Sequence, residues 1–109
     1  MAYDEKLADR IRKILRRRKG ITEKKMFGGI AFMLNGNMCC GVVNDDLMVR
    51  VGPEQHDKSM KQDHARLMDF TGRPMKGFLF IAPAGTRTEA TLVKWVRMAT
   101  SYVSSLPEK

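Results

Sequence analysis

Two pairs of adjacent residues are candidates for chemistry, a double cysteine and a double glycine within one short stretch. Residues 23–43 read EKKMFGGIAFMLNGNMCCGVV, and Cys39 and Cys40 are the only cysteines among the 109 residues. Adjacent thiols could act in redox chemistry, but these match neither a paired CxxC zinc pattern nor a disulfide framework. Neighbours along a strand point to opposite faces, so the two thiols are expected to be poorly placed to bridge each other. We interpret both as small apolar residues of the core, with a redox role as the alternative.

The double glycine, Gly28-Gly29, raises the question of a phosphate-binding loop. Such loops place glycines between a strand and a helix, where backbone N–H groups at the helix start meet the anion. Here the glycines precede a strand that ends in a hairpin turn, and the sequence contains no G-x-G-x-x-G and no Gly-Lys-Ser/Thr. We therefore interpret them as strand glycines that mark a bulge or close packing by a neighbouring element.

The other polar residues give little support for catalysis or metal binding. His56, Met60 and His64 lie four residues apart, so a continuous helix would place them on one side, where they could bind copper. We favour the simpler interpretation of polar residues on an exposed helix face. No Gly-x-Ser-x-Gly elbow is present. The sequence therefore predicts no catalytic residues, no cofactor, no metal site and no small-molecule substrate, and we expect a protein that is not an enzyme.

The strongest functional signal is a basic segment near the start of the chain. The stretch RIRKILRRRKG begins at Arg10 and carries seven basic residues in its first ten positions. Residues 1–25 hold ten Lys/Arg against four Asp/Glu, a balance of +6 within the net +8 of the chain. A positive ridge of this kind can contact phosphates and attract nucleic acid, whereas the plainer interpretation is a solvated helix face. The candidate nucleic-acid contacts are Arg12, Lys13, Arg16, Arg17 and Lys19.

The basic segment is expected to lie on an amphipathic helix from Asp4 to Lys19. Apolar residues recur there at spacings that place them on a single stripe, and Gly20 is a natural stop. Arg18 is the exception, because it falls among the apolar positions. Either the helix frays at Arg18, or the aliphatic stem of Arg18 covers the edge of the core while its head reaches water. The expected stripe consists of Leu7, Ile11, Ile14 and Leu15.

Three strand-like runs follow, over 26–34, 38–43 and 47–51, and tight turns connect them. Asn35-Gly36 is the strongest short hairpin signal, since a type I′ turn needs positive φ at both central residues. Asn44-Asp45, or else Asp45-Asp46, offers a second tight turn. The sequence thus predicts a three-stranded antiparallel meander.

The second half of the chain consists of short elements and ends in a long helix. Pro53 suits the first turn of a helix, and Thr86 and Glu89 have the spacing of a capping box. The expected elements are a short, partly exposed helix over 54–63, an edge strand over 66–70, a loop over 71–77, a strand over 78–82 and an amphipathic helix from Thr88 to about Leu106.

Grouped strands, rather than strands that alternate one by one with helices, argue for an α+β fold with a mostly antiparallel sheet. We expect one domain, residues 1–109, in which N- and C-terminal amphipathic helices flank the meander and one or two further strands in two layers. Alternation places Met33 and Met48, two of nine methionines, opposite the main apolar faces of their strands. If the helices cover only one face of the sheet, an apolar second face would favour dimerisation or ligand binding.

The sequence predicts no membrane-spanning segment. No run approaches the ~18 apolar residues of a membrane span, and the N-terminal sequence MAYDEKLADR lacks the apolar core of a signal peptide. We therefore expect a cytoplasmic protein without a membrane partner.

The run KKMFGGIAFMLNGNMCCGVVNDDLMVRVGPE resembles the N-terminal domain of the TfoX (Sxy) family of competence regulators. The resemblance includes the basic helix, the Asn-Gly hairpin and the DDLMVRVG strand, and it extends to FTGRPMKGFLFI and the final helix. It implies a small bacterial α+β domain, associated in its best-known members with the regulation of natural transformation. It brings no catalytic residue and no ligand. The full-length regulators continue into a second domain, and the sequence in hand covers one.

Residues and resemblance together predict a non-enzymatic regulatory or interaction module with a protein partner, for which a second copy of the chain is one candidate. The alternative is a transcriptional regulator that binds nucleic acid through the basic helix. A third hypothesis is a small thiol enzyme that uses Cys39 or Cys40.

Overall fold

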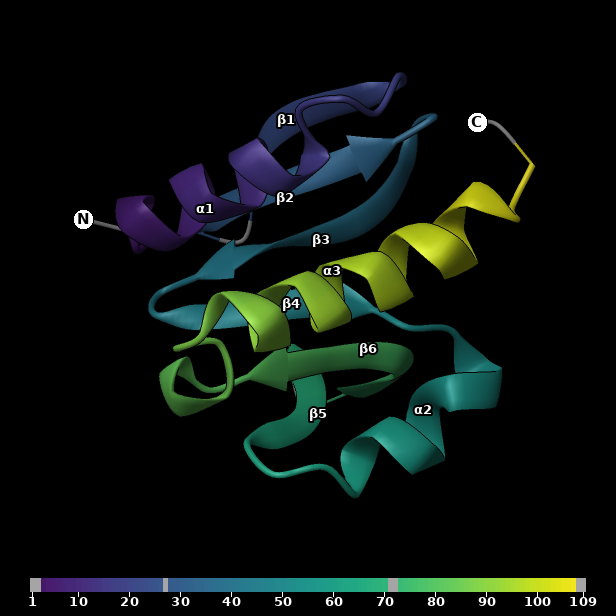
Figure 1. Ribbon diagram of the computed structural model, residues 1–109. Helices are drawn as coiled ribbons and strands as arrows, with labels where there is room; N and C mark the ends of the chain where they lie inside the picture. Colours follow the sequence, from purple (N-terminus) through teal and green to yellow (C-terminus); the bar gives the residue numbers. More distant parts are fainter. Residues whose placement is uncertain (1–2, 27, 71–72, 108–109) are drawn as a thin grey trace.

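The computed structural model describes residues 3–26, 28–70 and 73–107, and Figure 1 shows their arrangement. The elements in chain order are α1 (Glu5–Leu15), β1 (Ile21–Met26), β2 (Gly29–Leu34), β3 (Asn37–Val43), β4 (Asp46–Arg50), α2 (Pro53–Met60), β5 (Ala65–Phe70), β6 (Arg73–Ile81), a short 3₁₀ helix η1 (Pro83–Gly85) and α3 (Glu89–Ser104). The strands form one antiparallel sheet in the order β1-β2-β3-β4-β6-β5.

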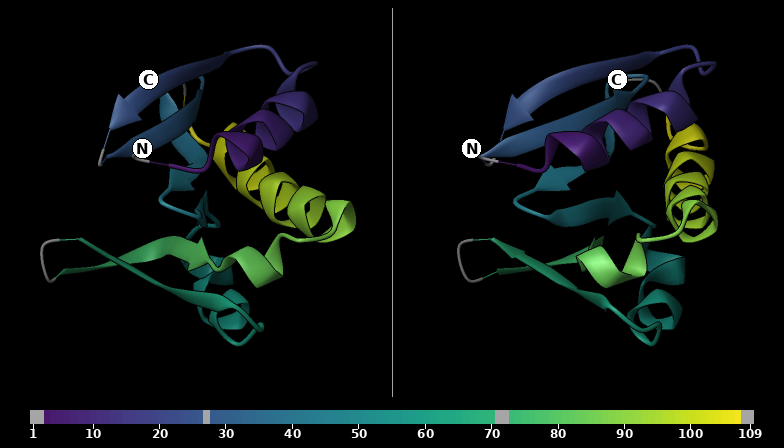
Figure 2. Two further views of the ribbon diagram at one scale, coloured as in Figure 1. Left: turned by 90° about the vertical axis from the view of Figure 1, so that its left-hand side faces the viewer. Right: turned by 60° about the vertical axis from the view of Figure 1, so that its left-hand side comes forward.

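The sheet has a helical layer on one face. Figure 2 shows α1 and α3 on the same side of the sheet, while the opposite side carries no helix in the described part of the chain. α2 packs against β6 and β5 at one end of the sheet. The predicted α+β fold, with terminal helices flanking an antiparallel sheet, is confirmed.

The meander contains one strand more than the sequence predicted. The single strand expected over 26–34 is wrong, because Gly28 has a φ of 73° and turns the chain between β1 and β2. Gly29 then lies in β2, where a Cβ atom would come within 2.0 Å of the carbonyl oxygen of Val42. The double glycine therefore serves as one turn residue and one site of close strand packing, the latter as predicted.

Both predicted tight turns are present. Asn35 and Gly36 have φ values of 53° and 83°, as a type I′ hairpin between β2 and β3 requires. Val43 pairs with Asp46 across β3 and β4, so Asn44-Asp45 forms the second two-residue turn. The edge strand expected over 66–70 and the short helix after Pro53 correspond to β5 and α2.

The first helix is shorter than its predicted range. The side chain of Asp4 caps α1, because its Oδ1 accepts the backbone N–H groups of Lys6 at 3.0 Å and Leu7 at 3.2 Å. The helix ends at Leu15, and the N–H of Arg18 bonds to the Leu15 carbonyl at 2.9 Å in a tighter turn. Of the two predicted alternatives, the chain therefore frays before Arg18, which would otherwise continue the apolar stripe.

Two predictions in the second half are wrong. In the loop expected over 71–77, the residues from Arg73 onward belong to β6, and residues 71–72 lie outside the described residues. A proline in this strand is tolerated because the β5–β6 register shifts next to Asp69, the partner of Pro74. The N-cap of α3 is Thr88, whose hydroxyl accepts the N–H of Thr91 at 3.3 Å, and not Thr86.

The core lies between the helical layer and the sheet. The predicted stripes of both long helices face it, with Ile14 and Leu106 half-buried at its margins. The buried members from the helices are Leu7, Ala8, Ile11, Leu15, Leu92, Trp95, Val96, Ala99 and Val103, and those from the central strands include Ile30, Phe32, Leu34, Val42, Leu47, Val49, Leu79 and Ile81.

Candidate interaction surface

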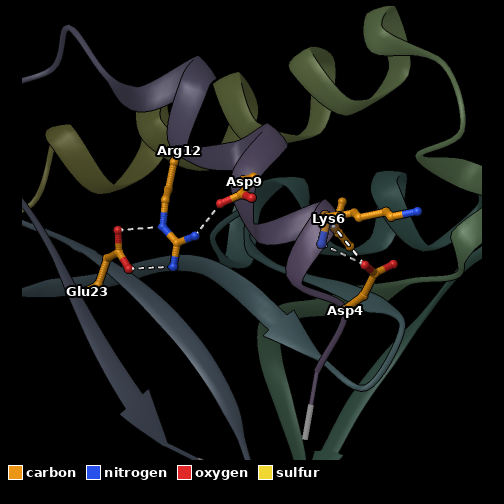
Figure 3. A network of polar contacts seen from close by, with 6 residues as sticks. Asp4, Lys6, Asp9, Arg12 and Glu23 are labelled. Atoms are coloured by element: carbon orange, nitrogen blue, oxygen red, sulfur yellow. Dashed lines mark hydrogen bonds and ion pairs between the residues drawn. The ribbon is translucent and has the colours of Figure 1, made fainter. Parts of the chain in front are cut away.

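Arg12 is a predicted nucleic-acid contact, but its side chain already forms contacts within the protein. Its Nε and Nη2 donate to the two carboxylate oxygens of Glu23 at 2.8 and 2.9 Å, and its Nη1 donates to Asp9 at 2.5 Å (Figure 3). Its guanidinium also lies over the Phe32 ring, 6.0 Å from the centroid. The bond to Glu23 is the main cause that raises the pKa of Arg12 above its ordinary value. Arg12 therefore fastens α1 to the edge strand β1.

The other basic residues at the end of α1 are free. Arg16, Arg17, Arg18 and Lys19 are all exposed and follow the last helical residue, while Lys13 is exposed on the helix itself. Within the described part of the chain, none of the five has an ion pair or a side-chain hydrogen bond. We call these five residues the cationic end of α1. It contains four of the five predicted contact residues and adds Arg18.

Two hollows border the cationic end of α1, and Arg18 lines both. The first, of about 260 Å³, runs between α1 and α3 and is lined by Ile14, Leu15, Arg18, Val93, Val96, Arg97 and Thr100. The second, of about 350 Å³, lies between α1 and the sheet and is lined by Arg12, Leu15, Arg16, Arg18, Ile21, Glu23 and Phe32. The free cations thus adjoin apolar surface on both sides of the helix end. The feature of the sequence that could have indicated the first hollow is the position of Arg18 among the apolar residues of the expected helix.

The prediction that Cys39 and Cys40 point to opposite faces is wrong. Phe32 pairs with Cys40 but Met33 pairs with Met38, so Cys39 is the extra residue of a β-bulge. Both thiols consequently lie in the core, where both residues are fully buried and free. A hydrogen bond with Cys39, followed by burial, raises the pKa of the Cys40 thiol well above its ordinary value. Their burial agrees with the interpretation as core residues and opposes thiolate chemistry, which needs an accessible, deprotonated sulfur.

A comparison with known families identifies the domain. The sequence matches the TfoX N-terminal domain over residues 13–102, which extends from the second half of α1 nearly to the end of α3. The chain belongs to the TfoX N-terminal domain family. No curated protein and no solved structure matches the chain.

The second sheet face of this TfoX N-terminal domain holds a small apolar cluster of its own. Met48, Ala31 and Phe80 are buried there, and Met33, Met38, Val43 and Phe78 pack around them half-buried. Arg50 lies over the Phe78 ring at 5.2 Å from its centroid, and Arg66 lies over the Phe80 ring at 5.1 Å. Met33 and Met48 are therefore on the predicted face, but neighbouring side chains already cover much of that face.

The histidines of this TfoX N-terminal domain do not share a helix face. His56 is buried in α2, and its Nδ1 accepts the backbone N–H of Gly77 at 2.8 Å. His64 lies beyond the end of α2 at a φ of 71° and is exposed. The interpretation of an exposed polar face is therefore wrong for His56, which joins α2 to β6. Among the residues that the structure describes, no three His, Cys, Asp or Glu side chains form a group that could hold a metal ion.

No helix in the described ranges is long and apolar enough to cross a membrane.

Proposed function

We propose that this TfoX N-terminal domain is a non-enzymatic regulatory module in the bacterial cytoplasm that acts by binding another protein. The observation that carries the proposal is the cationic end of α1, five exposed basic residues without an ion pair in the described structure. Exposed charges of one sign attract an oppositely charged partner and speed its association. Family membership supports a competence-regulator-like role.

The proposed partner is acidic rather than a second copy of the chain. Each copy carries a net charge of +8, so two copies repel each other at moderate ionic strength. Sedimentation at high protein concentration tests this point. A stable dimer in the presence of physiological salt would show that the partner is a second copy of the chain and not an acidic protein.

Partner capture with matched charge variants tests the proposal. The wild-type domain and the double variant Arg17→Glu/Lys19→Glu are used to capture proteins from a lysate of the native host. The control is Lys58→Glu/Arg87→Glu, which changes the net charge equally but at exposed positions in α2 and before α3. We expect a specific partner that the control retains and the first variant loses. If no partner depends on the cationic end, this surface is not the binding site.

Nucleic-acid binding is the second candidate, because four consecutive exposed cations at Arg16 to Lys19 can contact a phosphate backbone. Arg12 would not contribute, since its guanidinium is held by two carboxylates. With about four phosphate contacts, the logarithm of the binding constant should fall with the logarithm of salt concentration at a slope of about −3 to −4. Titration of a duplex DNA at several salt concentrations measures this slope. No binding at low salt would exclude the second candidate.

A further inference from the structure

The hollow between α1 and α3 combines an apolar floor with two unpaired arginines. The apolar floor consists of the aliphatic side chains that line the hollow: Leu15 and Val96, which are buried, and Ile14 and Val93, which are half-buried. The buried Thr100 also lines the hollow. Arg18 and Arg97 line the same hollow, and both are exposed. Neither has an ion pair within residues 3–26, 28–70 and 73–107.

The same two helices pair their charges elsewhere. Near the start of α3, Arg10 of α1 lies 3.8 Å from the carboxylate of Glu89 and donates to the Thr88 carbonyl at 3.4 Å. At that place the chain supplies both the cation and the acceptors for the contact between the helices. At the other end, the described residues that line the hollow include two cations, Arg18 and Arg97, and no carboxylate. Both guanidinium groups are exposed to solvent and are therefore available to a carboxylate of another molecule.

The chemistry of the hollow distinguishes between classes of ligand. Phosphates of a nucleic acid would satisfy the two guanidinium groups but would leave the apolar side chains of Ile14 and Val93 uncovered. At about 260 Å³ the hollow is also smaller than the roughly 300–1,000 Å³ that small-molecule sites occupy. A peptide that carries an aliphatic side chain between carboxylates matches both features, because arginine binds carboxylates well and the apolar floor accepts the aliphatic group.

We propose that the α1–α3 hollow binds an acidic peptide segment of a partner protein, with an aliphatic side chain in the hollow and carboxylates on Arg18 and Arg97. This inference rests on the proposed function, because it names the chemistry that the partner presents. It differs from that function in assigning the contact to one hollow and in requiring apolar burial as well as charge.

A labelled synthetic peptide is the probe. It has roughly 15 residues, enough for about four helical turns, with Leu flanked by Asp and Glu, and its binding is followed by fluorescence polarisation. One control peptide replaces Asp and Glu by Asn and Gln, and another replaces Leu by Ser. We expect binding of the acidic, Leu-containing peptide and at least about tenfold weaker binding of each control, the change that corresponds to losing about 1.4 kcal/mol.

Protein variants locate the site. Arg18→Glu/Arg97→Glu should weaken binding of the peptide at least about tenfold, since each reversal replaces an attraction by a repulsion. Lys58→Glu/Arg87→Glu makes the same change in net charge away from the hollow and should retain binding within about twofold. Val93→Gln, a change of a half-buried side chain, tests the apolar floor and should also weaken binding. Circular dichroism confirms that each variant is folded.

Three outcomes would overturn the inference. Equal weakening by both double variants would show that binding depends only on net charge. Unchanged binding of the Ser-containing peptide would show that the aliphatic side chain does not contribute to binding. Binding of a short DNA duplex, together with no binding of the acidic peptide, would assign the arginines to phosphates. If only this inference fails, partner capture that depends on Arg17 and Lys19 persists. If the proposed function also fails, no captured partner depends on Arg17 and Lys19.

Discussion

The bidentate contact between Arg12 and Glu23 shows that a basic residue in a charged run can be structural. The side chains of both residues are only 38% and 39% exposed, and Asp9 provides a second carboxylate from the same helix. A lysine at position 12 would keep the charge but could not donate to the two Glu23 oxygens from two separate nitrogens, because arginine has a planar fork of donors and lysine has a single ammonium nitrogen.

We expect Arg12→Lys to lower the free energy of unfolding by about 0.5–1 kcal/mol, at the upper end for a partly exposed ion pair. Urea denaturation followed by circular dichroism measures the change. Lys13→Arg at the neighbouring exposed position is the control and should be neutral. Equal effects at the two positions would show that the contact with Glu23 contributes nothing.

The two thiols give a prediction about reactivity. Because Cys39 and Cys40 are fully buried, Ellman's reagent should react with them only when the chain unfolds. Rapid reaction of either thiol in the native protein would revive the hypothesis of a thiol enzyme.

The raised pKa of Cys40 also predicts a dependence of stability on pH. The unfolded thiol ionises near the ordinary value of about 8.5, whereas the folded thiol stays protonated to higher pH. The unfolded state therefore loses the proton first, and stability falls above that value with a slope approaching about 1.4 kcal/mol per pH unit. Wild type should lose more stability than Cys40→Ala between pH 8 and pH 10 in urea denaturation. Parallel curves would contradict the assignment to Cys40.

At the scale of the elements, the two glycines of the β1–β2 hairpin have different roles and should respond differently to substitution. A Cβ at Gly29 would clash with the backbone of Val42, so Gly29→Ala should cost more than about 2 kcal/mol, as expected for overpacking that displaces a strand. Gly28 has open space around it and a positive φ, so Gly28→Asn should cost less than about 1 kcal/mol, since asparagine tolerates this region. Thermal unfolding of the two variants measures the difference. Similar losses would mean that strand packing is not what fixes Gly29.

Most elements could be predicted from local sequence, and the exceptions have identifiable physical causes. β1 was missed because it is an edge strand, where charged residues such as Glu23 and Lys24 replace the apolar alternation of an inner strand. The start of β6 was missed because Pro74 and Gly77 are typical of loops. The prediction that Cys39 and Cys40 lie on opposite faces was wrong because a β-bulge changes the alternation of side chains. Nothing in the local composition marks this bulge.

The candidate site was also predictable only in part. The run of cations is visible in the sequence, but the choice among them depends on contacts between distant residues. The carboxylate of Glu23 binds the guanidinium of Arg12 across the turn into β1. Arg97 of α3, in contrast, lines the same hollow as Arg18. Local periodicity cannot reveal which cations find a carboxylate and which remain free.

At the scale of the whole molecule, the sheet has a full core on one face and a small cluster on the other. Met48 is 1% exposed although no helix among the described residues covers its face. Met48→Ala should therefore lower the free energy of unfolding by about 2 kcal/mol or more, as expected for a buried methionine. Met33→Ala, at a half-buried position of the same cluster, should cost roughly half as much. Chemical denaturation tests the pair, and equal small losses would show that this cluster adds little to stability.

The bulge at Cys39 also determines where the chain tolerates a change in length. Met38 pairs with Met33 on one side of the bulge and Cys40 pairs with Phe32 on the other, so removal of Cys39 would leave β3 in continuous register with β2. Every remaining side chain of β3 would keep its face, and the main loss would be the packing of one buried thiol. Removal of Gly41, by contrast, would transfer part of the strand to the opposite face. Folded protein from the first deletion and unfolded protein from the second, distinguished by circular dichroism, would mark Cys39 as a residue that the sheet accommodates without needing it for alignment.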